Sequence, residues 1–377
     1  MCGICGTYWQ KHVKTKLNRD VSGCVLLDVP AMSELKVLNL AGETLLSLAL
    51  DCESTVLQLK SSIEIACGHT IEMQQLVYAG CPLEDDLATL RELGMQGGAE
   101  VSLILKPWDA DFRIGRLKEG QDLAIDDVKL ICSMAREAFL KQPSLLELRG
   151  PVVMAGHLIG CAKQLMHILD TFGEPPRQYL FLGNYVGRGR RQIHTLLLLL
   201  LYRQKYPERV HLLRGSSECG AMSRKNGFYD ECKRKLNVKM WKSFVDLFNC
   251  MPFGAILEDR ILCLPSGLSP ELRDVDQLRQ IARPCDVSES GLLSDLLWSS
   301  FKPSIKGWSL DGDIREFGPD VLDDFLALNS LEMMCCSCKV LRDTGHEAFG
   351  RWISVSSTSN YLGESWQASR QLYLSVE

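Results

Sequence analysis

The stretch QYLFLGNYVGRGRRQIHTLLLLLLYRQKYPERVHLLRGSSE, residues 178–218, decides the fold of most of this chain. It begins with an apolar run and a glycine-containing loop, continues through a leucine-rich segment of helical length, and ends in a second apolar run. A strand, a helix and another strand in this order predict a layered α/β unit. The preceding segments PVVMAG and CAKQLMHILDTFG predict a further strand and helix of the same unit.

Three polar loops follow the predicted strands of this unit: AGHLIG, GNYVGRG and RGSSE. Ligands of such folds bind outside the carboxyl ends of the strands, so we expect the three loops to meet in one crevice. The central loop has one Asn, one Tyr and one Arg, but no carboxylate, histidine or nucleophile. This composition predicts a loop that is built like an active-site loop but lacks catalytic side chains.

Residues 35–106 form a separate pattern. LKVLNLAGETLLSLALDC predicts a β-hairpin, and STVLQLKSSIEIACG predicts a helix that buries Val56, Leu59 and Ile63. Thr55 and Gln58 have the spacing of a capping box at its start. QQLVYAG and EVSLILK predict two further strands, which makes one small α+β unit.

This small unit resembles ubiquitin, most clearly over QQLVYAGCPLEDDLATLRELG. The C-terminal diglycine of ubiquitin is absent, so the resemblance implies a fused domain that is not conjugated through that end. Val77 and Ile104 match the apolar recognition patch of ubiquitin, and Ser102 stands where ubiquitin has a histidine. The expectation is a partner-binding surface at Val77 and Ile104, and the alternative is that these are ordinary strand residues.

From about residue 112 the chain resembles the catalytic domain of a type-1 Ser/Thr protein phosphatase of the metal-dependent phosphoprotein phosphatase family. KNGFYDECKRKLNVKMWKSFVDLFNCMPFGAI, GLSPEL, RPCDV and GLLSDLLW carry the resemblance. The expected fold class is α+β, an N-terminal ubiquitin-like β-grasp plus a C-terminal metallophosphoesterase-type layered α/β sandwich. The expected boundaries are a flexible extension over 1–34, the ubiquitin-like domain over 35–107 and the phosphatase-like domain over 108–377.

The family uses two divalent metals, held by the motifs GDxHG, GDxVDRG and GNHE and by two downstream histidines. Here GDxHG reads GHLIG, which leaves His157 and Ile159 at two ligand positions. GDxVDRG reads GNYVGRG, so the bridging Asp becomes Asn184. The downstream histidines become Pro265 and Cys338. Two divalent ions repel each other and need anionic ligands between them, so we expect no cofactor and no metal at these positions.

The proton donor of the family mechanism is also replaced. GNHE reads GSSE, which places Ser216 at a ligand position and Ser217 at the general-acid position, while Glu218 is kept. The Asp that supports the general acid is Gly187. No catalytic residue is therefore expected. An alternative is a single soft metal held by His157, Ser216 and Cys338.

The phosphate-binding half of the site is better preserved. Arg188 matches a phosphate-contacting arginine of the family, and Arg214 precedes the altered GNHE motif. Asn360 and Tyr361 in SNYLGE also match, and Arg315 is a candidate replacement for a second arginine. These groups predict vestigial phosphate binding. The alternative is that the arginines pair with Glu218 or other carboxylates and hold the loops.

The composition of the chain limits the kinds of partner that we expect it to bind. A formal net charge of −5 argues against a general nucleic-acid binder, and the longest apolar run is too short for a membrane span. The sixteen cysteines are irregularly spaced, which indicates reduced thiols and a cytoplasmic or nuclear protein. A zinc site at Cys2, Cys5, His12 and Cys24 is a further alternative.

Two functions follow from these observations. The first is a pseudophosphatase, a binding or scaffold protein whose partners are proteins: phosphoproteins, phosphatase partners or ubiquitin-pathway receptors. The second is a protein Ser/Thr phosphatase that hydrolyses phosphoserine or phosphothreonine with a rearranged metal site.

Overall fold

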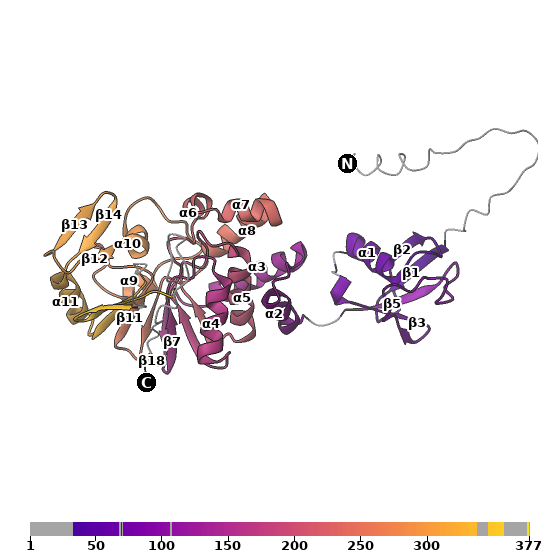
Figure 1. The fold of residues 1–377 in the computed structure, drawn as a ribbon, viewed down its shortest axis with the longest axis horizontal. Coiled ribbons are helices and arrows are strands. Elements are labelled where there is room, and N and C mark those ends of the chain that lie inside the picture. The colour runs from indigo at the N-terminus through magenta and orange to yellow at the C-terminus, as the bar shows by residue number, and fades with distance from the viewer. Residues whose placement is uncertain are drawn as a thin grey trace, which may run out of the picture. The chain divides into compact units, whose positions relative to one another are not determined.

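The structure is a computed structural model, and it describes residues 33–67, 69, 71–105, 108–337, 346–357 and 375–376. The chain divides between residues 106 and 107 into two compact units, each of which is described by itself (Figure 1).

The first unit is a five-stranded sheet packed against one α-helix. The strand order is β2-β1-β5-β3-β4. Its elements are β1 (Ser33–Leu38), β2 (Thr44–Leu50), α1 (Val56–Cys67), the short 3-10 helix η1 (Ile71–Met73), β3 (Gln74–Tyr78), β4 (Cys81–Pro82) and β5 (Glu100–Leu105).

Helix α1 begins where the sequence predicts. The Thr55 N–H donates to Gln58 Oε1 at 2.9 Å, and the Gln58 N–H donates to Thr55 Oγ1 at 3.3 Å, which confirms the capping box. The helix buries Val56, Leu59 and Ile63 against the sheet, as its apolar spacing predicts.

The second unit contains two larger sheets. The first has the order β18-β7-β8-β9, with β7, β8 and β9 parallel. The second has the order β16-β17-β15-β11-β10-β6. Their strands are β6 (Leu145–Leu148), β7 (Val152–Ala155), β8 (Gln178–Phe181), β9 (Val210–Leu212), β10 (Gly254–Leu257), β11 (Ile261–Leu264), β15 (Met333–Cys336), β16 (His346–Phe349), β17 (Trp352–Val355) and β18 (Ser375–Val376).

Helices and a small third sheet cover the outer faces of this pair. The third sheet is β12 (Ser300–Phe301), β14 (Ile314–Phe317) and β13 (Trp308–Asp311). The helices are α2 (Ala110–Lys118), α3 (Ile125–Leu140), α4 (Ala162–Phe172), α5 (Gln192–Lys205), α6 (Gly220–Lys225), α7 (Phe228–Lys235), α8 (Val238–Phe248), α9 (Asp276–Arg279), α10 (Leu292–Trp298) and α11 (Pro319–Leu328).

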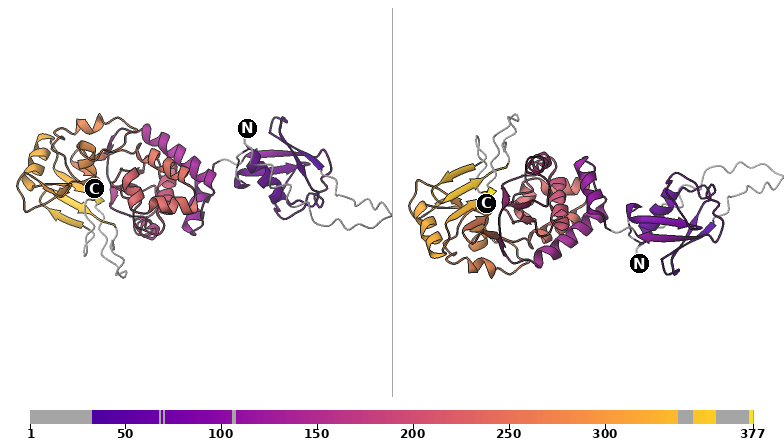
Figure 2. Two further views of the ribbon diagram at one scale, coloured as in Figure 1. Left: turned by 90° about the horizontal axis from the view of Figure 1, so that it is seen from above. Right: turned by 90° about the horizontal axis from the view of Figure 1, so that it is seen from below.

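Three clusters of buried apolar side chains lie between and beside the sheets of this unit. One cluster lies between the two large sheets and joins residues such as Met154 and Leu180 to Leu257 and Val355. A second fills the space between β7–β9 and helices α2, α3, α4, α5, α7 and α8, and a third lies on the far face of the other sheet. The same order of layers is visible from above and from below in Figure 2. The predicted fold class, a β-grasp unit followed by a layered α/β sandwich, is confirmed.

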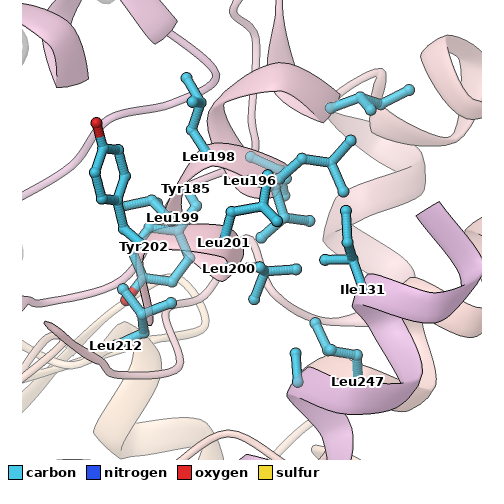
Figure 3. Packing of buried hydrophobic residues seen from close by; sticks show 14 of the residues in the cluster. Ile131, Tyr185, Leu196, Leu198, Leu199, Leu200, Leu201, Tyr202, Leu212 and Leu247 are labelled. Carbon is cyan, nitrogen blue, oxygen red and sulfur yellow. The ribbon is translucent and has the colours of Figure 1, made fainter. Parts of the chain in front are cut away.

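Helix α5 lies inside this core. Its leucines, residues 196–201, are at most 1% exposed, because α2, α3, α4 and α7 surround it. Figure 3 shows Leu196 and Leu198–Leu201 in one cluster with Ile131 of α3 and Leu247 of α8. A helix that is apolar all round is typical of such a central position. Within the described ranges, no helix combines the length and the apolar composition that a membrane span requires.

Candidate functional site

The three polar loops meet at the carboxyl ends of β7, β8 and β9. The N–H groups of Leu158 and Ile159 donate to Asn184 O at 3.1 and 2.8 Å, and the Gly160 N–H donates to Tyr185 O at 2.7 Å. The loop after β7 is therefore bonded to the loop after β8, as the prediction of one crevice requires.

Glu218 joins the second loop to the third. Its fully buried carboxylate accepts four backbone N–H groups: from Asn184 at 2.7 Å, Tyr185 at 2.9 Å, Val186 at 3.1 Å and Gly215 at 3.0 Å. Burial raises the pKa of Glu218 to about 7, and the four N–H donors act in the opposite direction. The carboxylate that survives from the family motif therefore holds the loops together.

Arg214 is also part of this framework. It is fully buried, and it donates from Nε to Glu218 O at 3.0 Å, from Nη1 to Cys285 O at 2.7 Å and from Nη2 to Asn249 Oδ1 at 2.7 Å. All three acceptors are neutral oxygens. Arg214 therefore holds the loops and contacts Glu218, as the alternative predicts, but through the backbone carbonyl of Glu218 rather than its carboxylate. Phosphate binding by Arg214 stays a prediction.

Asn184, which is predicted to stand at the position of the bridging ligand, has its side chain hydrogen-bonded within the protein. Oδ1 accepts the Ser217 N–H at 2.8 Å and the Ser216 hydroxyl at 3.1 Å. Its backbone has φ +58°, a left-handed conformation that Asn tolerates better than most residues. Through these two hydrogen bonds, Asn184 connects the second loop to the third.

Ile159 and Gly187 fit together in a way that excludes the family residues. Ile159 has φ +50°, which is unusual for a β-branched residue. A Cβ atom at Gly187 would lie 2.3 Å from Ile159 Cγ2. A side chain at position 187, such as the Asp that the family resemblance implies there, would therefore collide with Ile159 in this conformation.

His157 is buried, and its backbone N–H donates to Ser337 Oγ at 3.0 Å. Burial lowers the pKa of His157 to about 4, so the imidazole is neutral at neutral pH. Among the described residues, its Nδ1 has no hydrogen-bond partner.

The other predicted positions are distributed as follows. Pro265 is buried directly after β11, and Arg188 is exposed in the second loop. Arg315 lies in β14, with its Nε 3.3 Å from Asp295 Oδ1. Cys338, Asn360, Tyr361 and the N-terminal residues Cys2, Cys5, His12 and Cys24 lie outside the described residues.

Two supporting residues were not predicted. The Gly187 N–H donates to Gln192 Oε1 at 2.8 Å, and Glu231 accepts the N–H groups of Gln192 and Ile193 at the start of α5. Glu231 is 39 positions from Gln192, and no local pattern in the sequence indicates this contact.

In the first unit, Val77 and Ile104 lie on the same face of the sheet. Val77 is opposite Ser102 and Ile104 is opposite Gln75 in the β3–β5 pair, while the alternating residues Leu76 and Leu103 point into the core. Val77 and Ile104 are both partly exposed.

Comparison with known proteins defines the class. Residues 151–337 match the family model of calcineurin-like phosphoesterases, residues 113–149 match the serine-threonine protein phosphatase N-terminal domain, and residues 35–107 match the ubiquitin family. The chain therefore joins a ubiquitin-family domain to a Ser/Thr phosphatase domain of the calcineurin-like phosphoesterase family.

A solved structure is similar as well. It is a protein serine/threonine phosphatase from Saccharomyces cerevisiae that is described as similar to human phosphatase PP5. The sequence identity is 26% and the TM-score is 0.62, and the match covers 66% of this chain and 83% of that chain.

The family match contradicts the prediction that no cofactor is expected, because calcineurin-like phosphoesterases normally use divalent metals. The residues at the matching positions do not fit a pair of such ions. Ile159 and Pro265 offer no side-chain donor, and Asn184 Oδ1 already accepts two hydrogen bonds. Within the described ranges, no three His, Cys, Asp or Glu side chains lie close enough to hold a metal.

Proposed function

We propose that the phosphatase-like unit binds phosphorylated proteins without hydrolysing them. This proposal rests on one observation: polar groups of the three loops form hydrogen bonds with one another. Glu218 accepts four backbone N–H groups, and Ser217 stands at the general-acid position with its N–H bonded to Asn184. A serine hydroxyl is a far weaker acid than an imidazolium and gives little general-acid catalysis at neutral pH, so the family mechanism lacks an efficient acid.

A second candidate function is a Ser/Thr phosphatase with a rearranged site. The observation in its favour is His157, a buried neutral imidazole whose Nδ1 has no partner among the described residues. A neutral imidazole in this state is a suitable metal ligand. Replacing His157 by Asn separates the two functions, because it abolishes any phosphatase activity but leaves binding through Arg188 intact.

Binding of phosphate is expected to depend on Arg188, an exposed arginine of the second loop that matches a phosphate-contacting arginine of the family. Arg188→Gln should weaken the affinity for a phosphoserine peptide about tenfold, since it removes a charge-assisted contact. Fluorescence polarisation with a labelled peptide measures this. Arg190→Gln is the matched control, because Arg190 is exposed in the same loop and has the same charge. Equal affinities for wild type and Arg188→Gln would contradict the proposal.

We further propose that the ubiquitin-like unit recruits ubiquitin-pathway receptors through Val77, Ser102 and Ile104. Partly exposed apolar residues beside a small polar one offer a flat contact surface. The proposed partners are proteins, rather than nucleic acids or membranes. The described cysteines are all free thiols, which supports a cytoplasmic or nuclear location.

Addition of a ubiquitin-receptor domain to the ¹⁵N-labelled chain is expected to shift amide signals along β3 and β5. Ile104→Glu should abolish these shifts, because a carboxylate in the contact surface would lose its hydration on binding. Ile65→Glu is the control, since Ile65 is 87% exposed on α1 rather than on the sheet. A loss of binding in Ile65→Glu alone would place the surface on the helix instead.

A further inference from the structure

A cavity of the phosphatase-like unit lies apart from the three loops that follow β7, β8 and β9. It has a volume of about 450 Å³ and lies between α3 and α8, with residues 284–286 at one end. This volume is within the range of about 300–1,000 Å³ that is usual for small-molecule sites. None of the residues of the three crevice loops lines it.

The lining of this cavity carries opposite charges on opposite sides. Lys129 and Arg136 come from α3, whereas Asp246 comes from α8 and Asp286 from the loop that follows Pro284. Lys129 forms an ion pair with Asp126 on its own helix. In the described part of the chain, Arg136 forms no ion pair with Asp246 or Asp286. The cavity therefore has basic side chains on α3 and acidic side chains on α8 and at residue 286, and Asp286 also acts on the buried Arg214.

The interior beneath the cavity holds further positive charge. Arg283 donates from Nη1 to the carbonyl groups of Cys250 at 2.7 Å and of Phe139 at 3.1 Å, which are neutral acceptors. Burial raises the pKa of the Cys250 thiol, and Arg136 and Arg283 both act against this effect. The two guanidinium groups therefore lie near the same sulfur atom, and the Asp246 carboxylate acts on that atom in the opposite direction.

Arg214 connects this cavity to the crevice. Two of its three acceptors, Cys285 O and Asn249 Oδ1, belong to residues that line the cavity. The third, Glu218 O, belongs to the residue whose carboxylate holds the second loop. A ligand that orders Asn249 and Cys285 would therefore also order the crevice loops through one buried side chain.

From this geometry we infer that the cavity is a second binding site, which takes a small zwitterionic ligand of the amino-acid type. The anionic group of the ligand lies toward Arg136, and its cationic group lies toward Asp246 and Asp286. Polar lining residues such as Ser133 and Ser243 supply further hydrogen-bonding groups. A ligand with both charges is favoured over a simple anion or cation, because either of these would leave one side of the cavity unmatched.

Titration of the full chain with lysine and with phosphoserine, two zwitterions of different net charge, tests this inference. Saturable binding of at least one is expected by calorimetry, and acetate and methylammonium, which carry one charge each, should bind at least about tenfold more weakly. Arg136→Gln and Asp246→Asn should each weaken the binding about fivefold, and Ser133→Trp should block the cavity. Arg136, Asp246 and Ser133 are exposed, so these variants are expected to fold.

Hydrogen exchange of the same complexes tests the connection through Arg214. The bound zwitterion should slow exchange of the Asn184, Tyr185 and Val186 amides, which Glu218 accepts. Arg190→Gln is the control, because Arg190 is exposed and does not line the cavity, and it should leave the affinity for lysine unchanged. The inference is wrong if neither zwitterion binds, if acetate binds equally well, or if Arg190→Gln weakens the binding as much as Arg136→Gln does.

Discussion

Replacement of Glu218 by alanine is expected to lower the free energy of unfolding of the phosphatase-like unit by about 4–6 kcal/mol. The carboxylate accepts four buried backbone N–H groups, and each unpaired N–H costs about 1–3 kcal/mol. Water that enters the space left by the side chain restores part of this loss. The effect is therefore at the upper end of what single substitutions produce.

Differential scanning calorimetry of the full chain measures this loss. The transition of the phosphatase-like unit should move to lower temperature, while that of the ubiquitin-like unit should not. Glu218→Gln should have an intermediate effect, because its amide oxygen still accepts N–H groups and its amide nitrogen does not. Glu137→Ala, which removes an exposed carboxylate from α3, is the control. A loss below about 1 kcal/mol for Glu218→Ala would contradict the assigned role.

The second large effect is expected at Gly187. Gly187→Ala should cost about 1–3 kcal/mol, because its Cβ atom would lie 2.3 Å from Ile159 Cγ2 and 3.3 Å from Ile159 Cα. Ile159→Gly alone should cost little, since the lost apolar contacts are offset by relief of the left-handed backbone at φ +50°. In the double variant most of the cost of Gly187→Ala should disappear.

A double-mutant cycle with denaturant unfolding measures this coupling. The expected interaction energy between the two positions is about 1–3 kcal/mol. Gly97→Ala is a suitable control, because a Cβ atom there meets nothing within 4 Å. Additive effects at positions 159 and 187 would show that Ile159 does not occupy the space of the missing Asp.

The sequence predicts those features of the fold that depend on local patterns. The capping box of Thr55 and Gln58 and the alternating strands that follow α1 are set by residues a few positions apart. The same is true of the strand, loop and helix order of residues 178–218, in which β8, α5 and β9 were all found. The convergence of the crevice loops follows from the same order, because the strands are parallel.

The sequence does not predict how the crevice groups are used. Arg214 was expected to contact phosphate or a carboxylate, but its acceptors are backbone and amide oxygens up to 71 positions away. The contact between Ile159 and Gly187 depends on a left-handed backbone at a β-branched residue, which local propensity does not favour. The prediction that no cofactor binds is contradicted for a different reason. It was based on the replaced ligand residues and not on the divalent metals that the family normally uses.

Hydrolysis of a phosphoserine peptide by the purified full chain, with Mn²⁺ supplied in excess, tests the central claim most directly. From the contacts among the three loops we expect no phosphate release above the level without protein. Wild type and Arg188→Gln should not differ in this assay, although only the wild type should bind the peptide well. Metal-dependent turnover that is lost in Arg188→Gln and in His157→Asn would contradict it, and would establish a working phosphatase with a rearranged site.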